Sequence, residues 1–151
     1  MDRLPEPSAK ESFVQYESPD LSDVWQNPTA AQLEAVLRES PYEYWQGGGS
    51  GEAILRGQAG LILSITQPER GWFFLLLLDE WLVPYDGSPC DALIESEFGG
   101  NPFWIPRACL VDVDAAVGIA THFAAQFDPW PGVKWRNWAQ LPLPADYPHE
   151  A

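Results

Sequence analysis

Hydrophobic positions recur along this chain with two different periods, one typical of helices and one typical of strands. The stretch NPTAAQLEAVLRESP carries apolar residues every three or four positions, which predicts a helix that ends at Pro41. Two starts are compatible with the sequence. Asn27 could cap the helix with Pro28 in its first position. Alternatively, Thr29 and Gln32 form a capping box.

A second helix is predicted near the other end of the pattern, in the stretch VDVDAAVGIATHFAAQF. Asp112 is a suitable N-cap, because its side chain can accept a hydrogen bond from the first turn. The apolar residues that follow form one stripe at helical spacing, and they are Val113, Ala116, Val117, Ala120, Phe123, Ala124 and Phe127. A helix with such a stripe needs a hydrophobic surface to cover.

Between the two helices, short apolar runs are separated by turn residues, which is typical of β-strands. A glycine-rich turn at 47–51 precedes a short strand, and further strands are predicted at 60–67, 71–78 and 80–87. The sequence PERG suits a hairpin turn between the first two of these. The run WFFLLLL is continuously apolar. It indicates a central strand that is covered on both faces, or covered by helices on one.

The order of helix, strands and helix predicts an α+β fold. An antiparallel β-meander sheet packs against an N-terminal and a C-terminal helix on one face. The stretches ALIESEFGG and NPFWIPRACLV add one or two strands, with a turn at 99–101. Residues 25–151 form a single domain, because the chain of 151 residues has the usual size of one domain. Residues 1–24 are polar and are predicted to form a flexible N-terminal arm.

The charge of the chain excludes several classes of partner. With 22 acidic and 8 basic residues, the net charge is −14, so nucleic acids and anionic lipid surfaces repel the protein. The longest apolar run is far shorter than the roughly 18–20 residues that cross a bilayer. The N-terminal stretch lacks the apolar segment of a signal peptide. We predict a cytoplasmic protein that binds a basic protein partner and contacts neither nucleic acid nor membrane.

Residues suited to catalysis or metal binding are few. Cys90 and Cys109 lack the spacing of a zinc site or a disulfide framework, and His122 is interpreted as a partly buried helix residue. Glu95 and Glu97 share one face of a predicted strand, and with nearby aromatic residues they have the outline of a glycosidase cleft. No pair of acids stands out chemically from the others. We therefore predict no catalytic, metal-binding or cofactor-binding residue, no cofactor and no enzyme.

One stretch combines unbalanced charge with aromatic side chains. From Gly71 to Pro106 the sequence contains no Lys or Arg, while acids alternate with Trp, Tyr and Phe. Such a surface suits docking onto a basic cleft, because charge speeds association and buried aromatic residues hold the complex. The predicted charge partners are Asp79, Glu80, Asp86, Glu95 and Glu97, and the predicted anchors are Trp81 and Tyr85.

The stretch NPFWIPRACLVDVDAAVGIATHFAAQFDPWPGVKW resembles the C-terminal part of the Imm1 family of bacterial immunity proteins. The residues that match the family motif are Ile105, Pro106, Phe123, Val133 and Trp135. The sequence departs from the family at Phe127, where a glycine is common, and at Trp130, where a proline is common. Trp135 is predicted to be a structural lock that packs back against the helix or the sheet. Trp130 and Trp138 are less constrained and could be exposed.

This resemblance implies a function. Imm1-like proteins are cytoplasmic antidotes encoded beside polymorphic toxins, often nucleic-acid deaminases, and they occlude the active site of the toxin. A toxin of this class needs a basic groove for its substrate, so an acidic antidote fits it. We expect an immunity protein, or antitoxin, whose partner is a basic cognate toxin. The alternatives are a non-catalytic interaction module unrelated to toxins and a carbohydrate-binding or glycosidase-like domain.

Overall fold

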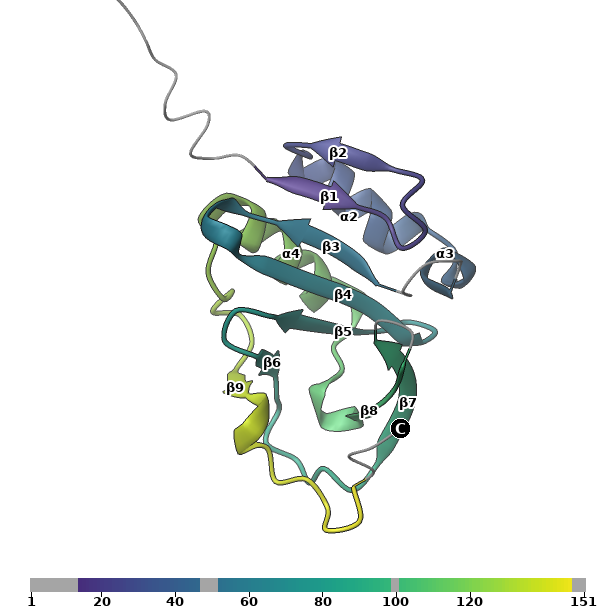
Figure 1. Cartoon of the computed structure of the whole chain (residues 1–151), viewed down its shortest axis with the longest axis vertical. Helices are drawn as coiled ribbons and strands as arrows, with labels where there is room; N and C mark the ends of the chain where they lie inside the picture. The colour runs from purple at the N-terminus through teal and green to yellow at the C-terminus, as the bar shows by residue number, and fades with distance from the viewer. Residues whose placement is uncertain (1–13, 47–51, 99–100, 148–151) are drawn as a thin grey trace, which may run out of the picture.

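The computed structural model describes residues 14–46, 52–98 and 101–147. Within these residues the chain forms an open antiparallel sheet of seven strands, a separate two-stranded hairpin and three α-helices (Figure 1), which confirms the predicted α+β fold. In their order across the large sheet, the strands are β2 (Val24–Gln26), β1 (Gln15–Glu17), β3 (Ala53–Arg56), β4 (Ile62–Glu69), β5 (Trp72–Leu77), β6 (Leu82–Pro84) and β9 (Trp135–Asn137). The hairpin and the helices are β7 (Leu93–Phe98), β8 (Asn101–Pro106), α2 (Ala30–Glu39), α3 (Tyr42–Gln46) and α4 (Val113–Gln126).

Both long helices begin at a side-chain cap. Thr29 and Gln32 complete the capping box of α2, because each side chain accepts a hydrogen bond from the backbone of the other, at 2.8 and 3.1 Å. The alternative start at Asn27 is wrong, since Asn27 has a positive φ of 51° and its side chain binds the backbone N–H of Val14. Asp112 caps α4 as predicted, at 3.0 Å.

Strand β5 lies between two hydrophobic cores, because successive side chains of a strand point to opposite faces of the sheet. Phe73, Leu75 and Leu77 belong to the core under α2 and α4. Phe74 and Leu76 belong to a second core, to which β8 and the segment after β9 contribute. The two long helices share the first of these faces (Figure 1). The apolar run is therefore a central strand covered on both faces.

The predicted flexible arm over residues 1–24 has the wrong boundary. Residues 14–26 form the β1–β2 hairpin at one edge of the sheet, where β1 pairs with β3. Tyr16 is buried, and its hydroxyl lies 2.7 Å from the hydroxyl of Tyr44. Apolar and polar residues alternate in β1, so even this short strand buries one face. Residues 1–13 lie outside the described residues, as do the predicted glycine-rich turn and two residues of the predicted 99–101 turn.

The C-terminal tryptophans pack against the rest of the protein. Trp135 packs against the core under α2 and α4, which we call the helix-side core. It donates its Nε1–H to the carbonyl oxygen of Trp130 at 2.8 Å, in agreement with a structural lock. Trp130 lies against Gly118 and Gly132, where an added Cβ atom would come within 2.5 and 2.4 Å of its ring. Trp138 packs against the second core. Trp130 and Trp138 are therefore half-buried rather than exposed.

The other residues of the Imm1-like motif also occupy structural positions. Ile105 and Pro106 are buried at the end of β8, and Phe123 is buried in the last turns of α4. Val133 is half-buried against the helix-side core. Phe127 ends α4 in a left-handed conformation, with φ of 60°. Glycine favours this conformation at helix ends, so the backbone of Phe127 has the shape that a glycine would adopt there.

Candidate functional site

The residues predicted to bind a partner lie in three separate places. Asp79, Glu80 and Trp81 form most of the turn between β5 and β6, which we call the acidic turn (residues 78–81). Tyr85 and Asp86 follow β6. Glu95 and Glu97 lie in β7 of the separate hairpin. The structure therefore does not join the whole predicted set into one surface.

Tyr85 is wrong as a predicted anchor. Its side chain is 8% exposed, packs in the second core and donates its hydroxyl to the carbonyl oxygen of Ser88 at 2.7 Å. Val83 and Tyr85 are two positions apart and point to the same buried face, a strand alternation that continues beyond β6. Asp86 is exposed, but its carboxylate accepts hydrogen bonds from the backbone and the hydroxyl of Ser88, so it shapes the local turn.

Glu95 is exposed on β7, opposite Trp104 of β8. The backbone of Glu97 pairs with Pro102 in the same ladder, while its side chain lies outside the described residues. The neighbouring pair in the ladder contains Ile105, which is buried in the second core. Because side chains alternate along a strand, Glu95 points away from that core, and it is absent from both hollows described below.

The acidic turn is held in place by the end of β9. The Nδ2 group of Asn137 donates to the carbonyl oxygen of Glu80 at 2.8 Å. The backbone N–H of Trp138 donates to the carbonyl oxygen of Trp81, also at 2.8 Å. Within the turn, the N–H of Trp81 donates to the carbonyl oxygen of Leu78 at 3.4 Å. The turn is thus fixed by a segment that lies far away in the sequence.

Trp81 has an unusual backbone conformation for a bulky residue. Its φ is 53°, in the left-handed region that glycine and asparagine normally occupy. Such a conformation costs roughly 1–2 kcal/mol for other residues. The Trp81 side chain nevertheless remains 39% exposed. Strained conformations of this kind gather at functional sites, so the acidic turn is a candidate binding element.

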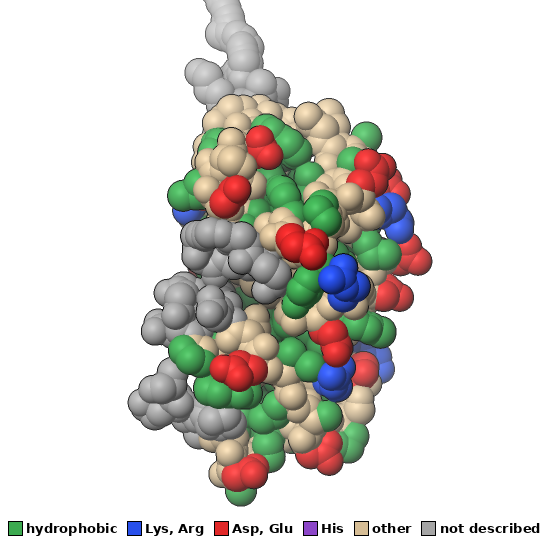
Figure 2. Space-filling view, turned by 90° about the vertical axis from the view of Figure 1, so that its right-hand side faces the viewer, with side chains coloured by type: hydrophobic (Ala, Val, Ile, Leu, Met, Phe, Trp, Pro, Cys, Tyr) green, Lys and Arg blue, Asp and Glu red, His purple; other side chains and the backbone are tan. Residues whose placement is uncertain are grey.

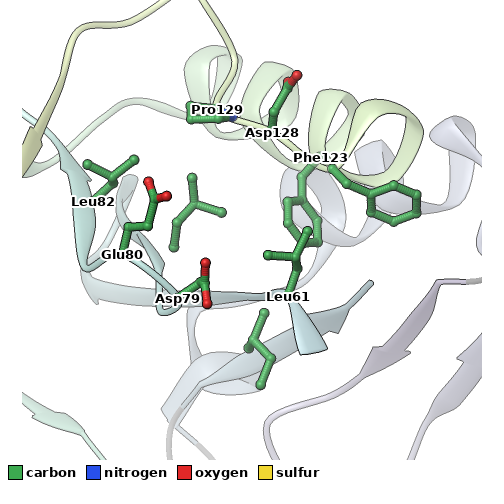
Figure 3. A pocket seen from close by; sticks show the side chains of 10 residues that line it. Leu61, Asp79, Glu80, Leu82, Phe123, Asp128 and Pro129 are labelled. Carbon is green, nitrogen blue, oxygen red and sulfur yellow. The ribbon is translucent and has the colours of Figure 1, made fainter. Parts of the chain in front are cut away.

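A hollow of about 170 Å³ lies between the acidic turn and the C-terminal end of α4 (Figure 3). We call it the acidic hollow. Its apolar lining includes Leu61, Leu77, Leu82, Phe123 and Phe127, and its acids are Asp79, Glu80 and Asp128. In Figure 3, Asp79 and Glu80 extend from the side of the turn, while the carboxylate of Asp128 is directed away from them.

Among the described residues, no basic side chain balances the charges in the acidic hollow. None of its described lining residues is Lys or Arg. Within the described part of the chain, the carboxylates of Asp79 and Glu80 form no ion pair. Asp128 instead contacts the Nε2 atom of His122. The acidic turn therefore carries two adjacent carboxylates that are free to meet a cation from outside.

A second, wider hollow of about 510 Å³ lies along the acidic turn. We call it the aromatic hollow, because its lining includes Trp81, Phe103 and Trp138. Asp79 and Glu80 line it as well, and none of its described lining residues is basic. Asp79 and Glu80 are thus lining residues of both hollows, and the turn lies between them.

The opposite end of β5 differs in its charge pairing. Figure 2 shows this side of the molecule, where some of the acidic side chains lie next to Lys or Arg side chains and others lie apart from them. Around the β4–β5 turn, Arg107 pairs with Glu69 at 2.6 Å and Arg70 approaches Glu43 at 3.9 Å. The guanidinium of Arg107 lowers the pKa of the Glu69 carboxyl.

Several residues of the two hollows escaped the sequence analysis. Asp128 and Leu61 lie outside the acidic, aromatic stretch 71–106 that was predicted to bind. Trp138 was considered only for its place beside the family motif. No local spacing connects Asp128 to Asp79. The burial of Tyr85, in contrast, follows from extending the strand alternation of β6 by one residue pair.

The chain matches no family model and no curated protein. The resemblance to the Imm1 family therefore stays a prediction. Within the described residues, no helix is long and apolar enough to cross a membrane. In the same part of the chain, no three His, Cys, Asp or Glu side chains gather as a metal-ligand cluster.

Proposed function

We propose that this protein is an immunity protein that binds a cognate bacterial toxin and occludes its basic active site with the acidic turn. One observation carries the proposal. Within the described residues, Asp79 and Glu80 form no ion pair, and they line two hollows whose described lining holds no basic residue, beside the exposed ring of Trp81. In a chain with a net charge of −14, this arrangement favours a cationic protein partner.

The chemistry of the expected toxin supports the proposal. An enzyme that modifies nucleic acids attracts phosphate groups with a basic cleft, and an acidic protein fits the same cleft. The resemblance of residues 101–135 to the Imm1 family points in the same direction, toward a cytoplasmic antidote of a nucleic-acid deaminase. Such an antidote acts by binding alone, so it needs no catalytic residue and no cofactor.

The build of the acidic hollow suits a basic side chain of the partner. Lys and Arg bury an aliphatic stem and keep the charged end near polar groups. Leu61, Leu77 and Phe123 provide an apolar lining for the stem, and Asp79 and Glu80 provide the charge. The hydrogen bond from Asn137 fixes the turn beforehand, which reduces the entropy lost on binding.

The proposal is tested by capturing the partner and then removing two charges at the turn. The tagged protein is first incubated with a lysate of its own source, and a bound basic, nucleic-acid-modifying protein is identified and purified. We expect Asp79→Asn with Glu80→Gln to weaken that complex by about tenfold or more and to flatten its salt dependence. Binding is measured by calorimetry or surface plasmon resonance at several salt concentrations.

The matched control removes the same number of charges from β7. Glu95→Gln with Glu97→Gln gives the same net charge as the double variant of the turn, at residues first predicted to bind. We expect the control to change affinity by less than about threefold. Equal losses in the two variants would mean that overall charge, rather than the acidic turn, governs binding. Failure to capture any basic protein at low salt would contradict the proposed function itself.

A carbohydrate-binding function is the second candidate, and the aromatic hollow favours it. Trp81, Phe103 and Trp138 supply apolar rings of the kind that sugars pack against. This function predicts binding of a neutral oligosaccharide that is insensitive to salt and to the Asp79→Asn, Glu80→Gln double variant. A screen of oligosaccharides by tryptophan fluorescence separates it from the antidote.

A further inference from the structure

We propose that the aromatic hollow accepts an arginine side chain of the partner in preference to lysine. This inference rests on the proposed function, because it names the chemistry that the partner presents to the acidic turn. The occupant is a guanidinium group, held against the rings of Trp81 and Trp138 and bonded to the carboxylates of Asp79 and Glu80.

The rings of the aromatic hollow are held in place by the second core. The Trp138 ring centroid lies 5.1 Å from that of Phe103 and 6.2 Å from that of Phe74. Tyr147 packs against the Trp138 ring as well, at 6.3 Å. The Trp138 backbone is joined to Trp81 through the hydrogen bond of 2.8 Å described above. The rings of Trp138 and Phe103 are therefore held by packing before a partner arrives, while the Trp81 side chain remains 39% exposed.

The charge of the hollow selects a cation. Asp79 and Glu80 line it, and no basic residue is among its described lining residues. An apolar group placed there would remove water from two carboxylates without replacing it, which is unfavourable. A cation offsets this desolvation by pairing with the carboxylates. The hollow thus combines the two features that bind a cation, namely aromatic faces and unpaired negative charge.

The aromatic lining of the hollow favours arginine over lysine. A guanidinium is planar, stacks on aromatic faces and can donate two parallel hydrogen bonds to a carboxylate. The ammonium group of lysine is compact and more strongly hydrated, so it gains less from a wide aromatic surface. Cation–π contact at exposed sites strengthens binding by about two- to fivefold. A second basic side chain can enter the acidic hollow, so that two cations flank the turn.

The test uses two peptides and does not require the natural partner. The probes are the capped pentapeptides Gly-Arg-Gly-Arg-Gly and Gly-Lys-Gly-Lys-Gly, titrated into the full-length, ¹⁵N-labelled protein at low salt. Nuclear magnetic resonance reports the indole N–H signals of Trp81 and Trp138. We expect the arginine peptide to shift both signals and to bind about threefold more tightly than the lysine peptide.

Two variants make the test specific. Trp81→Gly removes the ring while keeping the fold, because glycine suits the positive φ of 53° at this position. It should bind the two peptides equally. Trp72→Leu removes a different exposed tryptophan, 45% exposed at the start of β5, and should preserve the preference for arginine. A neutral oligosaccharide is titrated in parallel.

Each alternative outcome overturns the inference. It is wrong if the two peptides bind equally, if neither binds at low salt, or if Trp81→Gly retains the preference. Displacement of the arginine peptide by the oligosaccharide would assign the hollow to sugars instead. These failures are distinct from failure of the proposed function. A salt-dependent complex with a basic protein can exist without arginine selectivity, and arginine selectivity can exist without a captured toxin.

Discussion

The two ends of strand β5 carry similar residues but differ in how their charges are paired. At the β4–β5 turn, Glu69 pairs with Arg107, Arg70 lies over the ring of Tyr42, and Trp72 is exposed. At the acidic turn, two adjacent carboxylates lack an ion pair within the described residues, Trp81 is exposed, and two hollows flank the turn.

The difference shows that an acid beside a tryptophan does not by itself indicate a binding site. At the first end, the acidic charge is satisfied inside the molecule, so an external cation gains little there. At the second end, the charge is available, and the backbone of Trp81 is strained to present the turn. Pairing within the fold therefore distinguishes the two ends where composition does not.

The largest expected effect on stability comes from disturbing the packing of Trp130, which supports one side of the acidic hollow. Trp130 fits against Gly118 and Gly132 and so anchors the segment that contains Asp128 and Pro129. An alanine Cβ at position 118 would lie 2.5 Å from the Trp130 ring. We expect Gly118→Ala to lower the free energy of unfolding by about 1–3 kcal/mol, as overpacking usually does. Urea denaturation measures it.

A double-mutant cycle gives this prediction its control. In a Trp130→Ala background the clash is absent, so Gly118→Ala should instead stabilise α4 by up to about 1 kcal/mol, because alanine is the better helix former. The same sign of effect in both backgrounds would show that Trp130 does not restrict position 118. The segment with Asp128 and Pro129 would then not be anchored by the packing of Trp130 against Gly118.

A smaller effect on stability, with a defined pH dependence, concerns a buried acid, in contrast to the acids at the two ends of β5. Glu52 is buried and accepts a hydrogen bond from the Ser64 hydroxyl at 3.1 Å; burial raises its pKa above the ordinary 4.5. The folded protein therefore holds this proton more tightly than the unfolded chain, and stability falls as pH rises through the folded pKa.

Glu52→Gln should accordingly raise the free energy of unfolding at neutral pH, and its advantage should shrink as pH falls through the folded pKa of Glu52 and be gone below the unfolded value of 4.5. The amide oxygen can still accept the hydrogen bond from Ser64, so the substitution mainly removes the buried charge. Thermal unfolding from about pH 3 to about pH 8 provides the measurement. An advantage that is independent of pH would exclude titration of Glu52 as its cause.

The smallest effect is expected from the ion pair at the β4–β5 turn. Arg107 lowers the pKa of Glu69, so the pair stabilises the fold above the unfolded pKa of that carboxyl, and this contribution is lost as pH falls through the folded pKa. Glu69→Gln should slightly reduce stability at neutral pH and have no effect in acid.

The matched variant at the other end of β5 should behave differently. Asp79→Asn with Glu80→Gln removes charges that have no ion pair within the described residues, so we expect no loss of stability at neutral pH. Thermal unfolding at neutral and acidic pH is measured for Glu69→Gln and for the double variant of the acidic turn. If the double variant of the acidic turn were the less stable one, its carboxylates would contribute to folding, and the contrast between the two ends would disappear.

The sequence predicted the elements whose signals are local. The capping box at Thr29 and the cap at Asp112 define both long helices, and the apolar run of β5 indicated a central strand, of which the structure covers both faces. Strands β1, β2 and β9 were missed. Each has only three residues and forms because a neighbouring strand lies beside it, which is a long-range condition that no local period records.

The candidate site was predictable only in part for the same reason. Asp79, Glu80 and Trp81 adjoin one another in sequence and so were found together. Asp128 and Trp138 reach the same place through the fold of α4 and β9. Ion pairing also depends on contacts between distant elements, so a count of acids could not separate the charges that remain available from those that are satisfied.

The hydrogen bonds from Asn137 and Trp138 to the acidic turn determine when the turn can take its shape during translation. Asn137, which holds the carbonyl of Glu80, follows it by 57 residues in the chain. At about 5–20 residues per second, a ribosome needs roughly 3–11 s to add that stretch. During this interval a nascent chain already contains the two carboxylates but not the strand that fixes them. The shape of the acidic turn is therefore set only after β9 has left the ribosome, so a nascent chain carries the charges of the turn before it has the fixed geometry of the turn.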